Sequence, residues 1–203
     1  MVKNQKSLFC VIEGLDGSGT TTHSRLLTGF LEYKKYEVYL THEPTNSEIG
    51  LLLRDFLKNN KIPAATDALL FAADRVLHYQ NEIKKKLNEN YIVISDRYKE
   101  SSLIYQSVQS DEITLNWVKE INKFAGEPDI TIILDIDPKI ALARKMQKEL
   151  DKFENSAFLY KVRDLYIKRA KECNYYIVNS DDVIELVQED IQKIIINHLK
   201  ENV

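Results

Sequence analysis

The sequence has few of the residues that cross-link or interrupt a chain. Its 203 residues include two cysteines, six glycines and four prolines, and no Pro/Gly/Ser-rich linker divides it. Two cysteines cannot form a disulfide framework, and neither Cys10 nor Cys173 has a nearby cysteine or histidine with which to bind zinc. A reducing cytoplasm is therefore the expected location.

Long hydrophobic runs and an excess of positive charge are also absent. The uncharged apolar runs are too short to cross a membrane, and the N-terminus lacks the pattern of a secretory signal. The 28 basic and 31 acidic residues give a net charge of −3, which argues against a broadly basic surface for nucleic acid. A phosphate ligand is still compatible with this charge wherever basic residues gather locally. We therefore expect neither a nucleic-acid partner nor a membrane partner.

Apolar runs of strand length alternate with longer helical patterns along the whole chain. Five runs predict buried strands, at 8–12, 36–40, 91–94, 130–134 and 175–178. The stretches between them predict helices, at about 20–35, 47–59, 66–89, 101–125, 138–172 (with an interruption) and 182–200. The alternation predicts one doubly wound α/β domain over 1–203, with a five-stranded parallel sheet covered by helices on both faces. Ligands of such folds bind beyond the carboxyl ends of the strands.

A glycine-rich segment follows the first predicted strand. Residues 13–22 read Glu-Gly-Leu-Asp-Gly-Ser-Gly-Thr-Thr-Thr, which puts Gly14 and Gly19 in the frame of a phosphate-binding loop and Thr21 at its magnesium-ligand position. Backbone N–H groups of such a loop and of the next helix form a site for polyphosphate. The alternative is a strand-to-helix turn that binds no ligand.

The lysine that this loop pattern requires is replaced by Thr20. A neutral hydroxyl cannot supply the positive charge that the lysine brings to the β- and γ-phosphates. Either another cation takes its place, or the protein binds a nucleotide and turns it over slowly.

With four further motifs in order, the chain resembles the thymidylate kinase family, P-loop enzymes that phosphorylate dTMP with ATP. The resemblance covers about residues 8–170. The loop of the family reads E-G-x-D-G-[SA]-G-K-[ST]-T, which the chain matches except at the lysine. Residues 42–46, with Gly50 and Arg54, are similar to the R-E-P-G-G-T segment of the family, but lack its arginine and its glycine pair.

Residues 69–75 read Leu-Leu-Phe-Ala-Ala-Asp-Arg, nearly identical to the L-L-F-A-A-D-R of the family. The resemblance implies that Phe71 stacks on thymine and that Arg75 bonds to a base carbonyl. Their i to i+4 spacing puts both side chains on one face of a helix. The alternative is a core phenylalanine beside a surface ion pair.

Residues 96–106 look like the D-R-Y-x-x-S-x-x-A-Y-Q motif of the family. Here Asp96 is expected to hold hydrated magnesium and Arg97 to bridge the donor and acceptor phosphates, although an Asp-Arg pair is more often a structural salt bridge. Ser102 and Tyr105 fall where family members contact the base and the deoxyribose. Tyr105 occupies the position that favours 2′-deoxy substrates, and would otherwise be an ordinary core residue.

The segments 128–144 and 151–163 are similar to the P-D-L-T-x-x-L-D-V-x-P-x-x-A-x-x-R and D-R-F-E motifs of the family. Between them, about residues 144–156 correspond to the lid that closes over ATP. We predict that its basic residues Arg144, Lys145 and Lys148 substitute in part for the missing lysine. Taken alone, such a charge run is usually a solvated helix face.

The resemblance thus implies a homodimeric nucleoside monophosphate kinase that uses Mg·ATP to convert dTMP to dTDP for dTTP synthesis. The ATP-binding residues would be Gly14, Leu15, Asp16, Gly17, Ser18, Gly19, Thr20, Thr21 and Thr22. The dTMP-binding residues would be Asp16, Phe71, Arg75, Arg97, Ser102 and Tyr105. The catalytic residues would be Asp16, Arg97, Arg144, Lys145 and Lys148. Magnesium would be held by Thr21 and Asp96.

Two other interpretations remain open at this point. The first is a nucleotide-binding protein of the same fold with weak or lost catalysis, because the loop lacks its lysine. The second is a deoxynucleoside kinase, which needs a carboxylate base beyond the second strand, and Glu43 is the candidate for that base.

Overall fold

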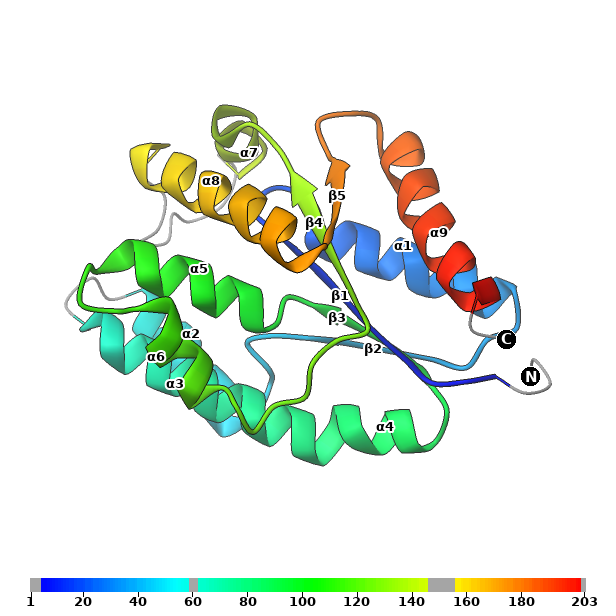
Figure 1. Ribbon diagram of the computed structural model, residues 1–203, viewed down its shortest axis with the longest axis horizontal. Helices are drawn as coiled ribbons and strands as arrows, with labels where there is room; N and C mark the ends of the chain where they lie inside the picture. The colour runs from blue at the N-terminus through cyan, green and yellow to red at the C-terminus, as the bar shows by residue number, and fades with distance from the viewer. Residues whose placement is uncertain (1–4, 59–61, 146–155, 202–203) are drawn as a thin grey trace.

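The computed structural model describes residues 5–58, 62–145 and 156–201, in which five parallel strands form one sheet in the order β2-β3-β1-β4-β5 (Figure 1). The strands are β1 (Leu8–Gly14), β2 (Val38–His42), β3 (Ile92–Asp96), β4 (Ile130–Asp135) and β5 (Tyr176–Asn179). The helices are α1 (Thr20–Tyr33), α2 (Glu48–Leu57), α3 (Ala64–His78), α4 (Lys84–Asn88), α5 (Lys99–Gln109), α6 (Leu115–Ile121), α7 (Pro138–Lys145), α8 (Ser156–Cys173) and α9 (Ile184–Glu201). A π-helical turn, η1 (Tyr79–Ile83), joins α3 to α4. The predicted fold class and all five predicted strands are confirmed.

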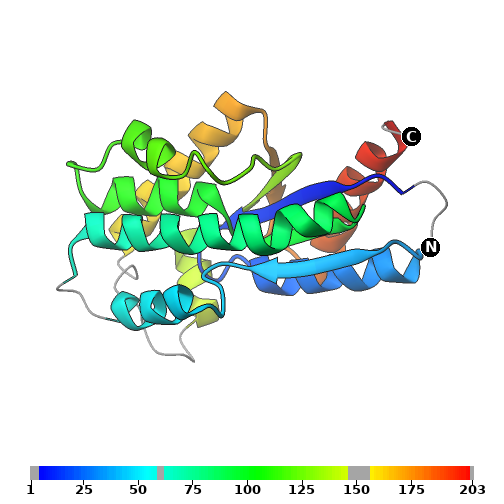
Figure 2. The same ribbon diagram turned by 90° about the horizontal axis from the view of Figure 1, so that it is seen from below.

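The central strand β1 is buried on both faces because successive side chains point to opposite sides of the sheet. On one face, Cys10 and Ile12 pack with Leu27 of α1 and Ile191 of α9. On the other face, Phe9 and Val11 pack with residues from η1 and β3 and with Tyr98, which precedes α5. Figure 2 shows α3, η1 and α4 running as one long helical rod along this second side, with α2 beside α3.

The edge strand β5 differs from the prediction that every strand is covered on both faces. Tyr176 and Ile177 of β5 are 45% and 42% exposed, whereas all seven residues of β1 are buried. β5 is last in the sheet order, so only β4 pairs with it. An apolar run alone does not show whether its strand lies at the centre or the edge of a sheet.

The predicted helix 101–125 is wrong as a single element, because it breaks into α5 and α6. Ser110 has an extended conformation after α5, and the Thr114 side chain caps α6 by accepting a hydrogen bond from the Trp117 backbone N–H. The polar residues between them compete with helical hydrogen bonding through their own side chains. The other predicted helices are present, with 66–89 divided among α3, η1 and α4.

The register brings the ends of the inner strands together. Ile12 of β1 and His42 of β2 both pair with Asp96 of β3, and Gly14 pairs with Leu134 of β4. The loops that follow these four strands therefore meet at one edge of the sheet, where ligands of doubly wound folds bind. Residues 146–155, which include Lys148 and most of the predicted lid, lie outside the described residues. Within the described part of the chain, no helix is long and apolar enough to span a bilayer.

Candidate active site

The glycine-rich loop connects β1 directly to α1. Gly17 and Gly19 have φ angles of 87° and 97°, in the left-handed region that favours glycine. A Cβ atom on Gly17 would lie 2.4 Å from the carbonyl oxygen of Ala141, so glycine is also needed for α7 to pack against the loop. Gly19 is the N-cap of α1 and contributes no side-chain cap, which leaves the first N–H groups of this helix suited to an anion.

A cavity of about 880 Å³ opens over this loop. It is lined by residues 16–23, Arg97, Arg144, Lys145, Ser180 and residues 182–185. The two cations from the end of α7 behave differently. The Lys145 Nζ lies 3.1 Å from Oδ2 of Asp16, whereas Arg144 donates a hydrogen bond to the Ser180 carbonyl oxygen.

Asp16 lies between two positive charges. Its Oδ1 accepts a 2.5 Å hydrogen bond from Arg97, its Oδ2 contacts Lys145, and its backbone N–H donates to the Tyr105 hydroxyl at 3.3 Å. Burial alone would raise the pKa of this carboxyl, but the charges of Arg97 and Lys145 outweigh burial and hold the pKa below its ordinary value. Asp16 is therefore an anion that orders two cations at the start of the loop.

Arg97 directly follows β3 and is fixed by several acceptors at once. Its guanidinium donates to the Gly14 carbonyl oxygen at 2.9 Å, to the Ser101 hydroxyl at 3.0 Å and to Asp16. Arg97 and Asp16 line both the cavity over the loop and a second cavity beside it. A rigid guanidinium between two cavities is suited to contact a phosphate from each side.

Buried Glu13 fixes the turn that carries Arg97. Its carboxylate accepts hydrogen bonds from the backbone N–H groups of Tyr98 and Ser101 and from the Ser101 and Tyr166 hydroxyls. Burial raises the pKa of Glu13, and the bond from Ser101 partly opposes that shift. Because the Ser101 hydroxyl donates to Glu13, its lone pairs are directed to Arg97.

Thr21 and Asp96 form a hydroxyl–carboxylate pair that could hold a metal, and of the two only Thr21 lines the larger cavity. The Thr21 hydroxyl donates to Oδ2 of Asp96 at 2.5 Å. Oδ1 of Asp96 is buried and has no hydrogen-bond partner among the described residues. Magnesium prefers oxygen ligands and keeps several waters, so a single carboxylate with one hydroxyl fits it. No cluster of three or more acidic, histidine or cysteine side chains that could hold a metal occurs in the described ranges.

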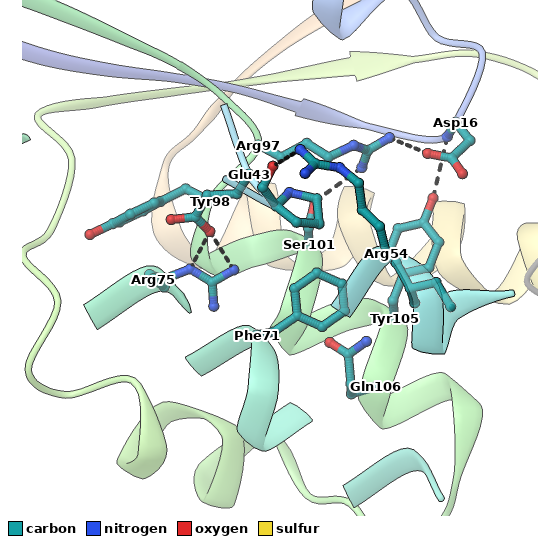
Figure 3. A pocket seen from close by; sticks show the side chains of 12 residues that line it. Asp16, Glu43, Arg54, Phe71, Arg75, Arg97, Tyr98, Ser101, Tyr105 and Gln106 are labelled. Carbon is teal, nitrogen blue, oxygen red and sulfur yellow. Dashed lines mark hydrogen bonds and ion pairs between the residues drawn. The ribbon is translucent and has the colours of Figure 1, made fainter. Parts of the chain in front are cut away.

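The second cavity has a volume of about 290 Å³ and lies between α2, α3 and α5 (Figure 3). It is lined by Asp16, Glu43, Pro44, Arg54, Leu57, Phe71, Arg75, Arg97, Tyr98, Ser101, Tyr105 and Gln106. Figure 3 shows the Phe71 ring between Arg75 on one side and Tyr105 on the other. An aromatic wall with three arginines around it suits a flat, anionic ligand.

The sequence model of the thymidylate kinase family matches residues 12–191 of the chain. The chain belongs to the thymidylate kinase family. It is 43% identical to a probable thymidylate kinase of Pyrobaculum aerophilum over 92% of this chain and 95% of the relative. It is also 41% identical to a probable thymidylate kinase of Pyrococcus horikoshii over 96% and 98% of the two chains. A third, from Staphylothermus marinus, is 38% identical over 98% and 99%.

The structure brings most of the residues suggested by the thymidylate kinase resemblance to one place. Phe71, Arg75, Arg97 and Tyr105 line the smaller cavity, and residues 16–22 of the glycine-rich segment line the larger one, whereas Gly14 and Leu15 do not. Ser102 is buried next to the smaller cavity but does not line it, so its contact with a base stays a prediction.

The structure does not place Phe71 in the core or Arg75 in a surface ion pair, which was the alternative interpretation of this motif. Phe71 is half-buried in the cavity wall rather than in the core. Arg75 does form an ion pair, with Glu43, but the Arg75 side chain is only 1% exposed. Because Glu43 is paired with Arg75 and also contacts His78, it is a poor candidate for the free carboxylate base of a deoxynucleoside kinase.

Arg54 lines the smaller cavity, but the sequence analysis did not include it among the predicted site residues. Its guanidinium donates to the carbonyl oxygens of Pro44 and Thr45. A Cβ atom on Gly50 would lie 2.1 Å from the Thr45 carbonyl oxygen, so this glycine lets α2 pack closely on the turn and bring Arg54 to it. The Gly50–Arg54 spacing was the sequence signal that could have identified this residue.

Proposed function

We propose that this member of the thymidylate kinase family transfers the γ-phosphoryl group of Mg·ATP to dTMP, giving dTDP and ADP for dTTP synthesis. The observation that carries the proposal is the pair of adjoining cavities that share Asp16 and Arg97. One cavity has the loop for a polyphosphate donor, and the other has the aromatic wall for a pyrimidine acceptor. In-line transfer requires donor and acceptor phosphates to meet, and Arg97 lies where they would.

On the donor side, the ATP phosphates are proposed to bind the backbone N–H groups of residues 14–22. Thr21 and Asp96 would hold Mg²⁺, which when bound neutralises charge on the donor phosphates. The support is the hydroxyl–carboxylate pair and the unpartnered Oδ1 of Asp96 among the described residues.

On the acceptor side, the charges favour one orientation of dTMP. Arg75 is already neutralised by Glu43, whereas within the described part of the chain Arg54 contacts only two backbone carbonyls and the His42 ring. The acceptor phosphate is therefore proposed to lie near Arg54 and Arg97. The base would then stack on Phe71 beside Arg75, which leaves the deoxyribose near Asp16 and Tyr105.

Lys145 is the cation that we propose in place of the missing loop lysine. Its ammonium group lies in the donor cavity, 3.1 Å from Asp16 of the loop, and its side chain is 20% exposed. Arg144 instead contacts Ser180 and Asp181 at the rim, and its side chain is 40% exposed. Lys148 lies outside the described residues and stays a prediction from the sequence.

No strong general base is needed for this reaction, because the acceptor phosphate is already an anionic nucleophile. The chain's own contribution is to position the two phosphates, exclude water and neutralise charge. Arg97 and Lys145 supply fixed positive charge, and Asp16 keeps both cations at the junction of the cavities.

A coupled turnover assay with ATP, Mg²⁺ and dTMP, dUMP or thymidine in parallel tests the proposal. We expect turnover with dTMP, and none with thymidine, because thymidine lacks the phosphate that Arg54 and Arg97 would bind. Binding of ATP and dTMP without transfer would instead show a nucleotide-binding protein, the result that Thr20 would favour. Transfer to thymidine in preference to dTMP would show a deoxynucleoside kinase.

We also propose a homodimer formed through the outer surface of α2 and α3, in the cytoplasm. Leu51 and Leu52 of α2 and Leu69 and Leu77 of α3 are each at least 40% exposed. A shallow apolar hollow lies on this surface, and Leu69 and Leu77 line it together with Val76. Exposed apolar side chains around such a hollow are typical of an interface between proteins.

Light scattering after size-exclusion chromatography tests the dimer. The native chain should elute with twice the mass of one chain, and a Leu69→Glu/Leu77→Glu variant should elute with the mass of one, because two buried carboxylates would face their symmetry mates. A Tyr33→Glu variant, which changes a side chain 82% exposed on α1, is the matched control and should remain dimeric. A native chain with the mass of one would contradict the proposal.

A further inference from the structure

Arg75 contacts three side chains from separate parts of the chain, namely Glu43, Tyr98 and Asn122. We propose that His78 and Asn122, acting with Glu43, are positioning residues that fix the Arg75 guanidinium and thereby set the preference for thymine over cytosine. The proposal rests on the proposed function in one respect, namely that the base lies beside Arg75. It adds two residues, His78 and Asn122, that do not line either cavity.

Glu43 holds one edge of the guanidinium. Its Oε2 accepts from Nε of Arg75 at 2.7 Å and lies 2.7 Å from Nη2 (Figure 3). The two side chains are 3% and 1% exposed, so neither charge is solvated. A buried ion pair keeps its geometry only when further hydrogen bonds satisfy its remaining atoms.

His78 satisfies the other oxygen of Glu43. Its Nδ1 lies 3.1 Å from Oε1 of Glu43, and its Nε2 lies 2.7 Å from the Thr41 hydroxyl. A carboxylate can only accept, so Nδ1 donates to Glu43, while Nε2 pairs with the Thr41 hydroxyl. Both oxygens of Glu43 therefore accept hydrogen bonds, Oε2 from Arg75 and Oε1 from His78. Rotation of the carboxylate away from Arg75 would break both.

Asn122, which follows α6, holds the opposite edge of the guanidinium. Its Oδ1 accepts from Nη1 of Arg75 at 2.7 Å, while its Nδ2 donates to the Val118 carbonyl oxygen at 2.8 Å. The bond to Val118 prevents the amide from flipping, so an acceptor always faces Arg75. The aromatic face of Tyr98 lies 5.5 Å from the guanidinium carbon and restricts it further.

Two N–H donors of Arg75 remain available for a ligand. A guanidinium has five N–H groups, and Glu43 and Asn122 occupy one on each of Nε, Nη1 and Nη2. One N–H on each terminal nitrogen remains, and each can only donate. Thymine presents a carbonyl at C4, which accepts, whereas cytosine presents an amino group, which does not. A fixed Arg75 therefore binds thymine more tightly than cytosine. A mobile Arg75 would lose this difference in affinity.

Steady-state kinetics with dTMP and dCMP test the proposal. Asn122→Leu and His78→Leu should each raise KM for dTMP about 10-fold and change kcat less than about 2-fold, since the lost interaction is present in both ground and transition states. The ratio of kcat/KM for dTMP to that for dCMP should fall by about the same 10-fold. His78→Asn keeps a donor facing Glu43 and should recover most of the KM.

A matched control distinguishes positioning from a general loss of stability. Arg169 and Glu100 form another buried ion pair, with side chains 5% and 7% exposed, and neither lines the two cavities. Arg169→Met should lower the melting temperature and leave the dTMP/dCMP ratio unchanged. If the leucine variants fail to fold, Asn122→Ser, which leaves room for a water, gives the same comparison.

The outcomes separate this proposal from the proposed function. Leucine variants that lose stability but keep the native KM and dTMP/dCMP ratio would overturn the positioning role. If the native chain binds dTMP without phosphorylating it, the proposed reaction fails, and the same ratio measured by calorimetric dissociation constants still decides whether His78 and Asn122 position Arg75.

Discussion

Replacing Lys145 with alanine should lower kcat about 100-fold while changing the KM for dTMP little, because one fixed charge at a developing phosphoryl transition state has an effect of this size. The Lys145 ammonium group lies beside Asp16 in the cavity over the glycine-rich loop, where we propose that it substitutes for the missing lysine. Loss of Lys145 should also let the pKa of Asp16 rise, because Lys145 is one of the two cations that lower it. Steady-state kinetics at saturating ATP and dTMP measure the effect.

Two further variants sharpen this experiment. Arg144→Ala removes an equal charge from the neighbouring residue, which contacts the cavity rim, and should lower kcat less than about 5-fold. Thr20→Lys should give little gain in the native chain but restore most of the rate in the Lys145→Ala variant. If Lys145→Ala keeps its native kcat and Thr20→Lys alone raises it, the idea of compensation by Lys145 is wrong.

Replacing Arg97 with lysine should lower kcat about 1000-fold, although the charge is kept, since a guanidinium between donor and acceptor phosphates is worth this much in phosphoryl transfer. The Arg97 guanidinium donates hydrogen bonds to the Gly14 carbonyl oxygen, the Ser101 hydroxyl and Asp16. It also lines both cavities. One ammonium nitrogen cannot reproduce this fork. Single-turnover kinetics separate a loss in transfer from a loss in substrate binding.

The matched comparison for Arg97 is Arg54→Lys. Arg54 lines only the acceptor cavity, so its replacement should raise the KM for dTMP and lower kcat far less than Arg97→Lys does. Melting curves of both variants exclude a folding defect as the cause. An Arg97→Lys variant with native kcat, or with a defect confined to the KM for dTMP, would contradict a role between the two phosphates.

Much of the fold was predictable because its signals are local. The β1 strand, the glycine-rich loop and the start of α1 follow one another in the chain, and each depends on residues close in sequence. The break between α5 and α6 was missed, although the Thr114 cap is also a local signal. The exposure of β5 could not be predicted, because it depends on sheet order rather than on the composition of the strand.

The candidate site divides in the same way. Phe71 and Arg75 were predicted because one short motif contains both. Arg54 was missed as a site residue although it belongs to a segment that resembles the family, because its contact with the cavity depends on packing of α2 on the 44–46 turn. Ser101, rather than the predicted Ser102, faces the cavity. Counted from Asp96, the D-R-Y-x-x-S motif places its serine at residue 101, so this part of the site could have been predicted from the sequence.

By itself, the sequence determined the doubly wound fold, the glycine-rich loop without the lysine of the family and the thymidylate kinase resemblance. All three rest on spacings within short segments of the chain. Only the tertiary structure decided which cation meets the loop, because Lys145 and Asp16 are 129 positions apart. It also decided that Arg75 is held by Asn122, 47 positions away. Contacts over such separations depend on how helices pack on the sheet, and no local pattern encodes that packing.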